Sequence, residues 1–188
     1  MFISPCERLA LFIDGTNLYA TSRALGFDLD FKQLLALFRE QGHLVRAHYY
    51  TTLEDEEEFC SVKPLVDWLT YNGYATITKP VRRFIDSNGR RFRGKIDVEL
   101  AVDAMRLQSG LDHIAIFSGN GDFRYLVAAL QEQGKRVSIV STLATQPPMV
   151  ADELRRQADQ FIDLADLEPL IGRPRSNSPA AEVPRAKG

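Results

Sequence analysis

The chain has 188 residues, of which 45% are hydrophobic and 26% are charged. This length slightly exceeds that of a typical domain of about 100 to 150 residues, so we expect one domain with a short appendage. The composition excludes a chain that is disordered throughout. The formal net charge of −2 gives no overall attraction to nucleic acid, so any binding of phosphate would have to come from local clusters of basic residues.

Signals of membrane, secreted and zinc-binding proteins are missing from the sequence. The longest apolar runs, such as Leu9 to Ile13 and Leu126 to Leu130, are far shorter than the ~20 residues that span a bilayer. No basic segment precedes an apolar stretch at the N-terminus, which argues against a signal peptide. The two cysteines, Cys6 and Cys60, lie far apart and the three histidines are scattered. This pattern argues against a disulfide scaffold and a zinc site, and it predicts a cytoplasmic protein without membrane contact.

Strands and helices are predicted to alternate along the chain. Apolar runs predict strands at 9–14, 44–52, 74–81, 113–118 and 136–141. Apolar residues at helical spacing predict helices that begin after Asp30 and end at Gly42, lie within 54–71, and cover 97–108, 122–133 and 149–158. Residues 161–170 close the domain. The Asn88-Gly89 pair between Phe84 and Phe92 predicts a small basic hairpin.

This order of elements predicts the fold class. Alternating strands and helices with short connections are typical of an α/β fold, three-layered and doubly wound, with helices on both faces of a mainly parallel sheet. We expect this domain to cover residues 1–172. Residues 173–188 are polar and rich in proline, so we expect them to form a disordered tail.

Acidic residues are predicted to meet at one edge of this sheet. In an open parallel sheet, ligands bind beyond the carboxyl ends of the strands, where the strand order reverses. Asp14 ends the first strand, Asp122 follows the strand at 113–118, and Asp97 begins a helix that runs antiparallel to the strands. These carboxylates converge if the first and fourth strands are neighbours. Asp103 lies roughly 9 Å further along the helix and about 240° around it, so it reaches the site only if the helix tilts.

Structural roles are alternatives for the same residues. Asp14 alone could shape a turn, and Asp97 and Asp122 could cap helices. Asp103 could form a salt bridge. Asn17, one turn after Asp14, is placed either to cap the helix or to hold a water or a phosphate oxygen. Capping and turn formation do not require acidic residues from three separate segments to meet at one edge of the sheet. Their expected convergence therefore favours a ligand site.

The converging carboxylates predict a site for a hard divalent cation. Carboxylates that crowd together raise one another's pKa unless a cation neutralises them. Mg²⁺ binds oxygen ligands, completes its shell with water and phosphate oxygens, and activates a bound water for attack on a phosphodiester. We therefore expect Asp14, Asp97 and Asp122 to share such a cation.

A basic segment leads into Asp97. It carries Phe84 and Phe92 between its basic residues and contains a single acid, Asp86. Such a segment can follow a phosphate backbone while its rings stack on bases, and the alternative is a hairpin that is merely solvated. The predicted nucleic-acid-binding residues are Lys79, Arg82, Arg83, Arg90, Arg91, Arg93 and Lys95, together with Ser118 in the loop after the strand at 113–118.

Three segments resemble a known family. They are Phe-Ile-Asp-Gly-Thr-Asn at 12–17, Lys-Ile-Asp-Val-Glu-Leu-Ala-Val-Asp at 95–103 and Ser-Gly-Asn-Gly-Asp-Phe at 118–123. In this order they resemble the NYN domain, specifically its LabA-like branch of the PIN-like nucleases, over about residues 8–170. The resemblance implies a PIN-like (Rossmannoid) fold and a ribonuclease site that uses Mg²⁺ or Mn²⁺ on single-stranded or structured RNA. The family's acidic and polar positions correspond to Asp14, Asn17, Asp97, Asp103 and Asp122.

The chain departs from this family at one position. The last motif of the family usually reads Ser-Gly-Asp-Gly-Asp, and the middle acid is here Asn120. An amide oxygen can still ligate a metal but contributes no charge, so the affinity for Mg²⁺ should fall. The leading hypothesis is a ribonuclease with the metal ligands Asp14, Asp97, Asp122 and Asn120, and with Asn17 and Asp103 in the catalytic set. The alternative is a catalytically weakened or inactive RNA-binding regulatory module.

Two other classes are disfavoured. Residues 13–16 echo the signature of haloacid dehalogenase phosphatases, but Phe12 stands where the nucleophilic aspartate is required. A dinucleotide-binding fold would need a G-x-G-x-x-G run after its first strand, which this sequence lacks. The oligomeric state is left open, with a homodimer as one alternative.

Overall fold

The computed structural model describes residues 4–54, 62–81, 84–85, 91–92 and 95–173. Its centre is a six-stranded sheet in the order β4-β3-β1-β7-β8-β9, in which every neighbouring pair is parallel. The strands of this sheet are β1 (Arg8–Asp14), β3 (His43–Glu54), β4 (Tyr74–Val81), β7 (His113–Phe117), β8 (Arg136–Ser141) and β9 (Gln160–Asp163).

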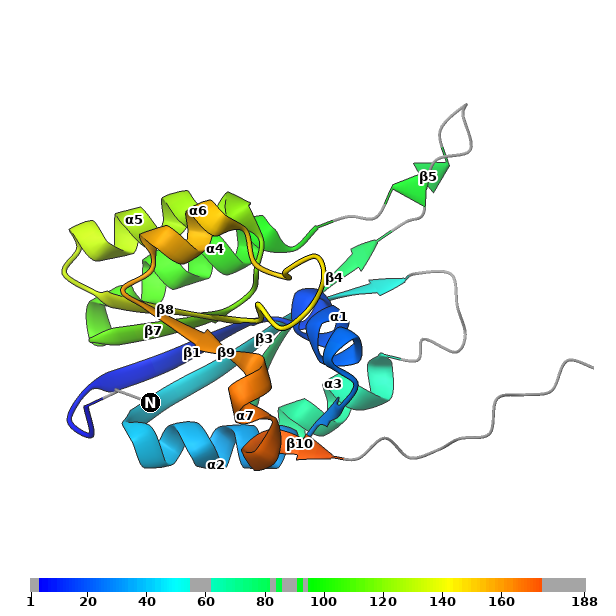
Figure 1. Cartoon of the computed structure of the whole chain (residues 1–188), viewed down its shortest axis with the longest axis horizontal. Coiled ribbons are helices and arrows are strands. Elements are labelled where there is room, and N and C mark those ends of the chain that lie inside the picture. The colour runs from blue at the N-terminus through cyan, green and yellow to red at the C-terminus, as the bar shows by residue number, and fades with distance from the viewer. Residues whose placement is uncertain (1–3, 55–61, 82–83, 86–90, 93–94, 174–188) are drawn as a thin grey trace, which may run out of the picture.

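Helices cover both faces of this sheet (Figure 1). One face carries α1 (Gly15–Leu25), α2 (Phe31–Gln41), α3 (Lys63–Tyr71) and α7 (Leu164–Ile171). The other face carries α4 (Asp97–Leu107), α5 (Arg124–Glu132) and α6 (Asp152–Gln157), with short 3₁₀ turns at Gln108–Gly110 and Gly121–Phe123. The expected α/β fold, three-layered and doubly wound around a parallel sheet, is therefore confirmed.

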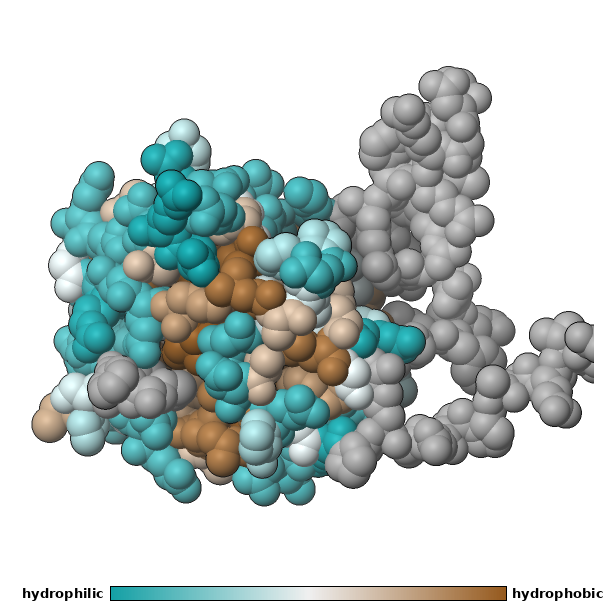
Figure 2. All heavy atoms as spheres, viewed as in Figure 1, coloured by the Kyte–Doolittle hydropathy of each residue, from teal (hydrophilic) through white to brown (hydrophobic). Residues whose placement is uncertain are grey.

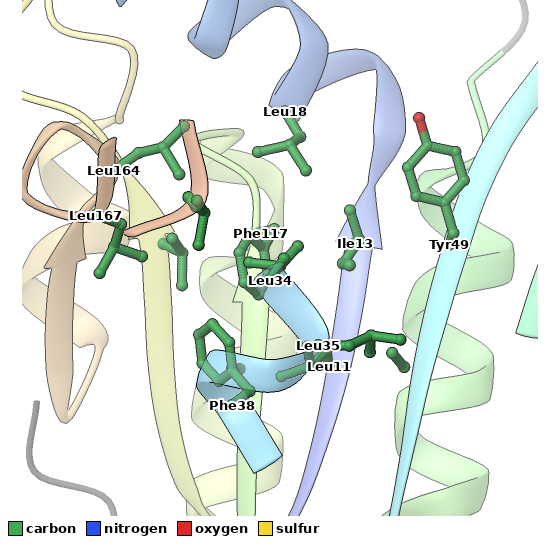
Figure 3. Packing of buried hydrophobic residues seen from close by; sticks show 14 of the residues in the cluster. Leu11, Ile13, Leu18, Leu34, Leu35, Phe38, Tyr49, Phe117, Leu164 and Leu167 are labelled. Atoms are coloured by element: carbon green, nitrogen blue, oxygen red, sulfur yellow. The ribbon is translucent and has the colours of Figure 1, made fainter. Parts of the chain in front are cut away.

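The apolar run of β1 supplies both halves of the core. Leu9, Leu11 and Ile13 face the helices α1, α2, α3 and α7, whereas Ala10 and Phe12 face α4, α5 and α6. All five are buried, as expected for a strand in the middle of a parallel sheet. Figure 3 shows the first cluster, in which Leu11, Ile13 and Phe117 of the sheet pack against Leu34 and Phe38 of α2.

The strand order reverses between β1 and β7. From β1 the chain builds outward through β3 and β4, and it then returns to the other side of β1 to add β7, β8 and β9. The pairing of β1 with β7 puts the residues after Asp14 and after Phe117 at the same edge of the sheet. This is the place where open α/β sheets bind ligands.

Local signals in the sequence explain most of the element boundaries. Asp30 caps α2 by accepting hydrogen bonds from the backbone N–H groups of Lys32 and Gln33, and Gly42 ends the helix. Pro64 stands in the first turn of α3, where its missing N–H costs no hydrogen bond. The helix expected at 149–158 is shorter and spans Asp152–Gln157.

Three features were not expected from the sequence. Helix α1 begins directly after Asp14, although small polar residues dilute its apolar pattern. Strand β10 (Gly172–Arg173) pairs with β2 (Asp28–Leu29), and the Arg173 guanidinium lies 2.6 Å from Asp30 Oδ2. Arg173 therefore contacts the domain, whereas the rest of the expected tail, 174–188, lies outside the described residues.

The expected hairpin is seen only in part. Strand β5 (Phe84–Ile85) pairs antiparallel with β6 (Arg91–Phe92). The predicted Asn88-Gly89 turn and the basic positions Arg82, Arg83, Arg90 and Arg93 lie outside the described residues.

The surface in Figure 2 is mainly hydrophilic over α5 and α6, and hydrophobic residues reach it in the middle of this face, around the edge strand β9 and α7. In the described part of the chain, no helix has both the length and the apolar character needed to cross a membrane.

Candidate functional site

Asp14 is the buried carboxylate at the point of strand reversal. Its Oδ1 accepts a hydrogen bond from the Asn17 backbone N–H (3.1 Å), which caps α1, and its Oδ2 accepts one from the Ser118 hydroxyl (3.2 Å). The residue is only 7% exposed. Burial raises the pKa of the Asp14 carboxyl above its ordinary value; these two hydrogen bonds lower it in part, and the nearby Asp97 raises it further.

The loops after β1 and β7 are joined to each other. The Asn17 side chain accepts a hydrogen bond at Oδ1 from the Gly119 backbone N–H (3.0 Å). Gly119 has no room for a side chain, because a Cβ atom there would collide with the carbonyl oxygen of Met149. Gly15 is confined in the same way by the ring of Tyr49. The two glycines leave room for the Tyr49 ring and the Met149 carbonyl group, and the hydrogen bond to Asn17 joins the loops after β1 and β7.

Asn120 connects the loop after β7 to the first residue of α4. Its Nδ2 donates a hydrogen bond to Asp97 Oδ2 (3.0 Å), and its Oδ1 accepts one from the Asp122 backbone N–H (3.1 Å). Its own backbone N–H donates to the Ser118 hydroxyl (3.2 Å). Asn120 therefore gives Asp97 a neutral hydrogen-bond donor, in a place where an aspartate would be a third carboxylate.

These groups line one cavity of about 500 Å³. Of the predicted site residues, the cavity brings together Asp14, Asn17, Lys95, Asp97 and Asn120. The Lys95 ammonium lies at its mouth, 3.7 Å from Asp97 Oδ2 and 3.5 Å from Asp122 Oδ2. Lys95 thus offers a positive charge beside Asp97 of the cavity and Asp122 outside it.

Two predicted acids do not line this cavity. The Asp122 side chain is 72% exposed and lines a neighbouring groove instead. Asp103 accepts a hydrogen bond from the hydroxyl of the buried Tyr50 (3.2 Å) and lies 3.6 Å from the Arg106 guanidinium. The structure does not bring Asp103 to the cavity, because its place along and around α4 directs it to another flank. The expected convergence holds for Asp14 and Asp97.

The predicted nucleic-acid-binding residues have mixed positions. The Lys79 ammonium lies 2.7 Å from Glu99 Oε1 and donates to the Lys95 carbonyl oxygen (3.1 Å). Ser118 is fully buried, so its hydroxyl holds the loop and is not offered to a ligand. Arg91 lies in β6, and the remaining arginines of the set fall outside the described residues.

Sequence reasoning missed Thr52, which also lines the cavity. It is buried near the end of β3, the strand that pairs with β1. The rule that ligands bind at the carboxyl ends of strands, applied to every strand and not only to acidic residues, would have found it.

The donor set fits a cation that needs few protein ligands. Among the described residues, no group of three or more His, Cys, Asp or Glu side chains is arranged to hold a metal ion. Asp14 and Asp97 nevertheless supply two carboxylates in one cavity, and Mg²⁺ usually takes one or two carboxylates and fills its other positions with water and phosphate oxygens. The raised pKa of Asp14 indicates a carboxylate whose charge lacks full compensation.

Comparisons with known proteins identify the fold and the family of this chain. The Low amplitude and bright protein LabA of Synechococcus elongatus is 34% identical over 183 residues, which cover 95% of each chain. The crystal structure of VPA0982 from Vibrio parahaemolyticus, described as a protein of unknown function, superposes with a TM-score of 0.69 at 22% identity over 87% of this chain and 96% of its own. The MAR1 ribonuclease of Caenorhabditis elegans, with a TM-score of 0.40 and 13% identity, is too distant to assign a function.

The family model described as NYN domain matches residues 8–168, and the expected resemblance to LabA is confirmed by the sequence identity. Because the family model covers most of the chain and the identity to LabA extends over 95% of it, the chain belongs to the NYN domain family.

Proposed function

We propose that this protein is a metal-dependent ribonuclease that hydrolyses RNA phosphodiester bonds at the cavity containing Asp14 and Asp97. The observation that carries this proposal is the burial of Asp14 beside Asp97 at the point of strand reversal, with a raised pKa. A carboxyl whose pKa is raised in the folded state costs stability when it is ionised, so a role in ligand binding explains it better than capping alone. Membership of the NYN family supports a nuclease or another RNA-related function.

In this proposal, Asp14 and Asp97 hold Mg²⁺ or Mn²⁺, with water and phosphate oxygens as the remaining ligands. When bound, the cation would polarise the phosphodiester and lower the pKa of an attacking water. The predicted ligand Asp122 lies outside the cavity and forms an ion pair with Lys95. Of the other predicted members of the set, Asp103 accepts a hydrogen bond from Tyr50, and Asn120 donates one to Asp97.

The chain's own residues prepare the cavity for a phosphate. Asn17 holds the loops after β1 and β7 together, which fixes Asp14 relative to Asn120. The exposed Lys95 ammonium can exchange its carboxylate partners for a phosphate oxygen, because neither of its two contacts is shorter than 3.5 Å.

A cleavage assay tests this proposal. Purified protein is incubated with a labelled single-stranded RNA and Mn²⁺ or Mg²⁺, and the rate of cleavage is measured on a gel. Asp14→Asn should lower the rate at least ~100-fold, because it removes one of two metal-binding carboxylates. Asp152→Asn on α6, which removes an exposed carboxylate away from the cavity, is the matched control and should retain the wild-type rate. Cleavage that persists in Asp14→Asn contradicts the proposal.

A second candidate function is an RNA-binding regulatory module without catalysis. The observation that favours it is the hydrogen bond from Asn120 to Asp97, which occupies a carboxylate oxygen and supplies no negative charge. This candidate predicts RNA binding that weakens with salt, no cleavage by the wild type, and cleavage by Asn120→Asp. Cleavage by the wild type that is lost in Asp14→Asn would exclude it.

The location and the assembly of the protein stay predictions. The cytoplasmic location and the homodimer expected as one alternative would be tested by cell fractionation and by sedimentation of the purified chain.

A further inference from the structure

A second concavity adjoins the candidate functional site. It is a groove of about 580 Å³ between α4 and α5. Lys95 and Asp97 line both this groove and the acidic cavity, so the two spaces meet at these residues. A polymer whose backbone is held in the cavity can therefore continue into the groove.

The walls of this groove are largely apolar and open to solvent. From α4 they include Val98, which is 70% exposed, and Met105, which is 38% exposed. From α5 they include Tyr125, which is 78% exposed. An apolar patch of this kind, bounded by polar residues, commonly marks a binding surface. The polar boundary here is the ion pair of Lys95 and Asp122 at the end nearest the cavity.

Tyr125 has the surroundings of a stacking platform. It lies in the first turn of α5, and the guanidinium carbon of Arg124 lies 5.6 Å from the centre of its ring. Exposed aromatic rings bind successive bases of single-stranded nucleic acids by stacking, and arginine adds a cation–π contribution. A planar base therefore matches the ring, and its backbone phosphate matches the Lys95 ammonium at the junction.

We propose that the groove between α4 and α5 is a nucleobase-binding subsite. Tyr125 and Arg124 hold the base of a nucleotide next to the phosphodiester that occupies the acidic cavity, and Lys95 contacts the phosphate between them. This inference rests on the proposed function, since it takes RNA as the ligand of the cavity. It does not depend on the basic segment at 82–93, and it assigns base contacts to a different part of the molecule.

The subsite has a consequence for the choice of RNA. Inside a duplex, both faces of a base are covered by its neighbours, so a base must leave that stack before it can stack on Tyr125, and the groove therefore favours single strands over a continuous duplex. Every base has a flat face, so stacking alone gives little preference for sequence. Single-stranded oligonucleotides should therefore bind more tightly than duplexes of the same strand.

A binding experiment without metal tests the subsite. The affinity for a short fluorescent single-stranded RNA is measured by anisotropy in EDTA, so that no cleavage takes place. Tyr125→Ala should weaken binding about tenfold, because a stacked base is lost. Tyr125→Phe keeps the ring and should retain affinity to within about twofold. Tyr71→Ala, which removes an 89% exposed tyrosine at the end of α3, is the matched control and should bind like the wild type.

An oligonucleotide with abasic nucleotides separates stacking from other effects. If Tyr125 stacks on a base, Tyr125→Ala and wild type should bind the abasic RNA with equal, weakened affinity. The subsite is overturned if Tyr125→Ala binds normal RNA as tightly as wild type does. It is also overturned if the substitution weakens the binding of abasic RNA as much as it weakens the binding of normal RNA. It is also overturned if sedimentation shows that Tyr125→Ala disrupts a dimer while RNA affinity is unchanged.

This test and the cleavage assay fail in different ways. Binding that depends on Tyr125 without cleavage by the wild type would keep the subsite and remove the nuclease assignment. Cleavage that depends on Asp14, with RNA binding insensitive to Tyr125, would keep the nuclease and remove the subsite.

Discussion

The two ends of strand β1 carry acidic residues in opposite circumstances. Glu7, just before the strand, accepts a hydrogen bond from Arg136 Nη1 (2.8 Å) and lies 3.0 Å from His113 Nδ1. Burial acts to raise the pKa of Glu7, but the hydrogen bonds from Arg136, His113 and the Ser4 backbone, together with the charge of Arg136, hold this pKa below the ordinary value. Asp14, at the other end, has neutral donors and a neighbouring carboxylate, and its pKa is raised.

The comparison separates a structural carboxylate from a functional one. The network around Glu7 continues from His113 Nε2 to the Ser138 hydroxyl (2.7 Å), so it ties β1, β7 and β8 together at their amino ends. Its charge is compensated within the protein, and it therefore stabilises the fold. The charge of Asp14 lacks such compensation and is available to a cation.

Replacing each carboxylate with its amide should change the free energy of unfolding differently at the two ends of β1. Glu7→Gln should lower the free energy of unfolding by about 1 to 2 kcal/mol, because charged hydrogen bonds to Arg136 and His113 are weakened. Asp14→Asn should leave stability unchanged or raise it by up to ~1 kcal/mol in metal-free protein, since it removes a buried charge and keeps a capping side chain. Urea unfolding at neutral pH measures both. A large loss of stability in Asp14→Asn would show that this carboxylate is structural.

Asn120→Asp should lower the stability of the metal-free protein and increase the stabilisation that a bound metal ion provides. The change replaces the donor to Asp97 with a third carboxylate, so metal-free protein should lose about 1 to 2 kcal/mol. Added Mg²⁺ should raise the melting temperature of Asn120→Asp more than that of wild type, because a cation binds the extra charge.

Asn72→Asp is the matched control for this prediction. Asn72 donates to the Trp68 carbonyl oxygen at the end of α3, and it is not among the residues of the cavity. Its aspartate variant should melt at the same temperature with and without Mg²⁺. An equal response of both variants would indicate a non-specific effect of salt.

Acidification should destabilise the amino edge of the sheet. Burial lowers the pKa of His113 below its ordinary 6.5, so the unfolded chain takes up a proton before the folded chain does. The free energy of unfolding should therefore fall as the pH drops below about 6.5, and the lowered pKa of Glu7 continues the loss at more acidic pH. Asp14 works in the opposite direction, because its raised pKa lets the folded chain take up a proton first.

Unfolding curves between pH 7 and pH 5 measure this dependence. His113→Gln should have a flatter profile than wild type over this range, because the titrating ring is gone. A profile in His113→Gln that is as steep as that of wild type would assign the dependence to other groups.

The sheet topology and the position of the acidic residues at its carboxyl edge could be predicted, because both follow from general rules for parallel sheets. Continuous apolar runs predicted the buried strands, and the switch-point rule, together with the antiparallel course of the helix that Asp97 begins, placed Asp14, Asp97 and Asp122 at one edge without any coordinates. Helix α1 escaped prediction, because only Leu18 and the partly buried Leu25 of its residues contact the main hydrophobic cluster, and its start depends on the cap from Asp14.

The remainder of the site depends on side-chain contacts that a linear pattern does not contain. Asp103 matched the family position, yet the hydroxyl of Tyr50, more than fifty residues earlier in the sequence, binds it on another flank of α4. The network of Glu7, His113 and Ser138 also joins residues far apart in the sequence, and the histidine could only be described as scattered.

Because Asp14 caps α1 and would also bind the cation, the first turn of α1 should report whether a cation is bound. The carboxylate that would grip a cation is also the acceptor for the Asn17 backbone N–H. Drawing electron density from that oxygen weakens the hydrogen bond, so the amide proton of Asn17 should shift in a ¹H–¹⁵N NMR spectrum as Mg²⁺ is added. Hydrogen exchange at the same amide would report whether the first turn loosens when the carboxylate is engaged.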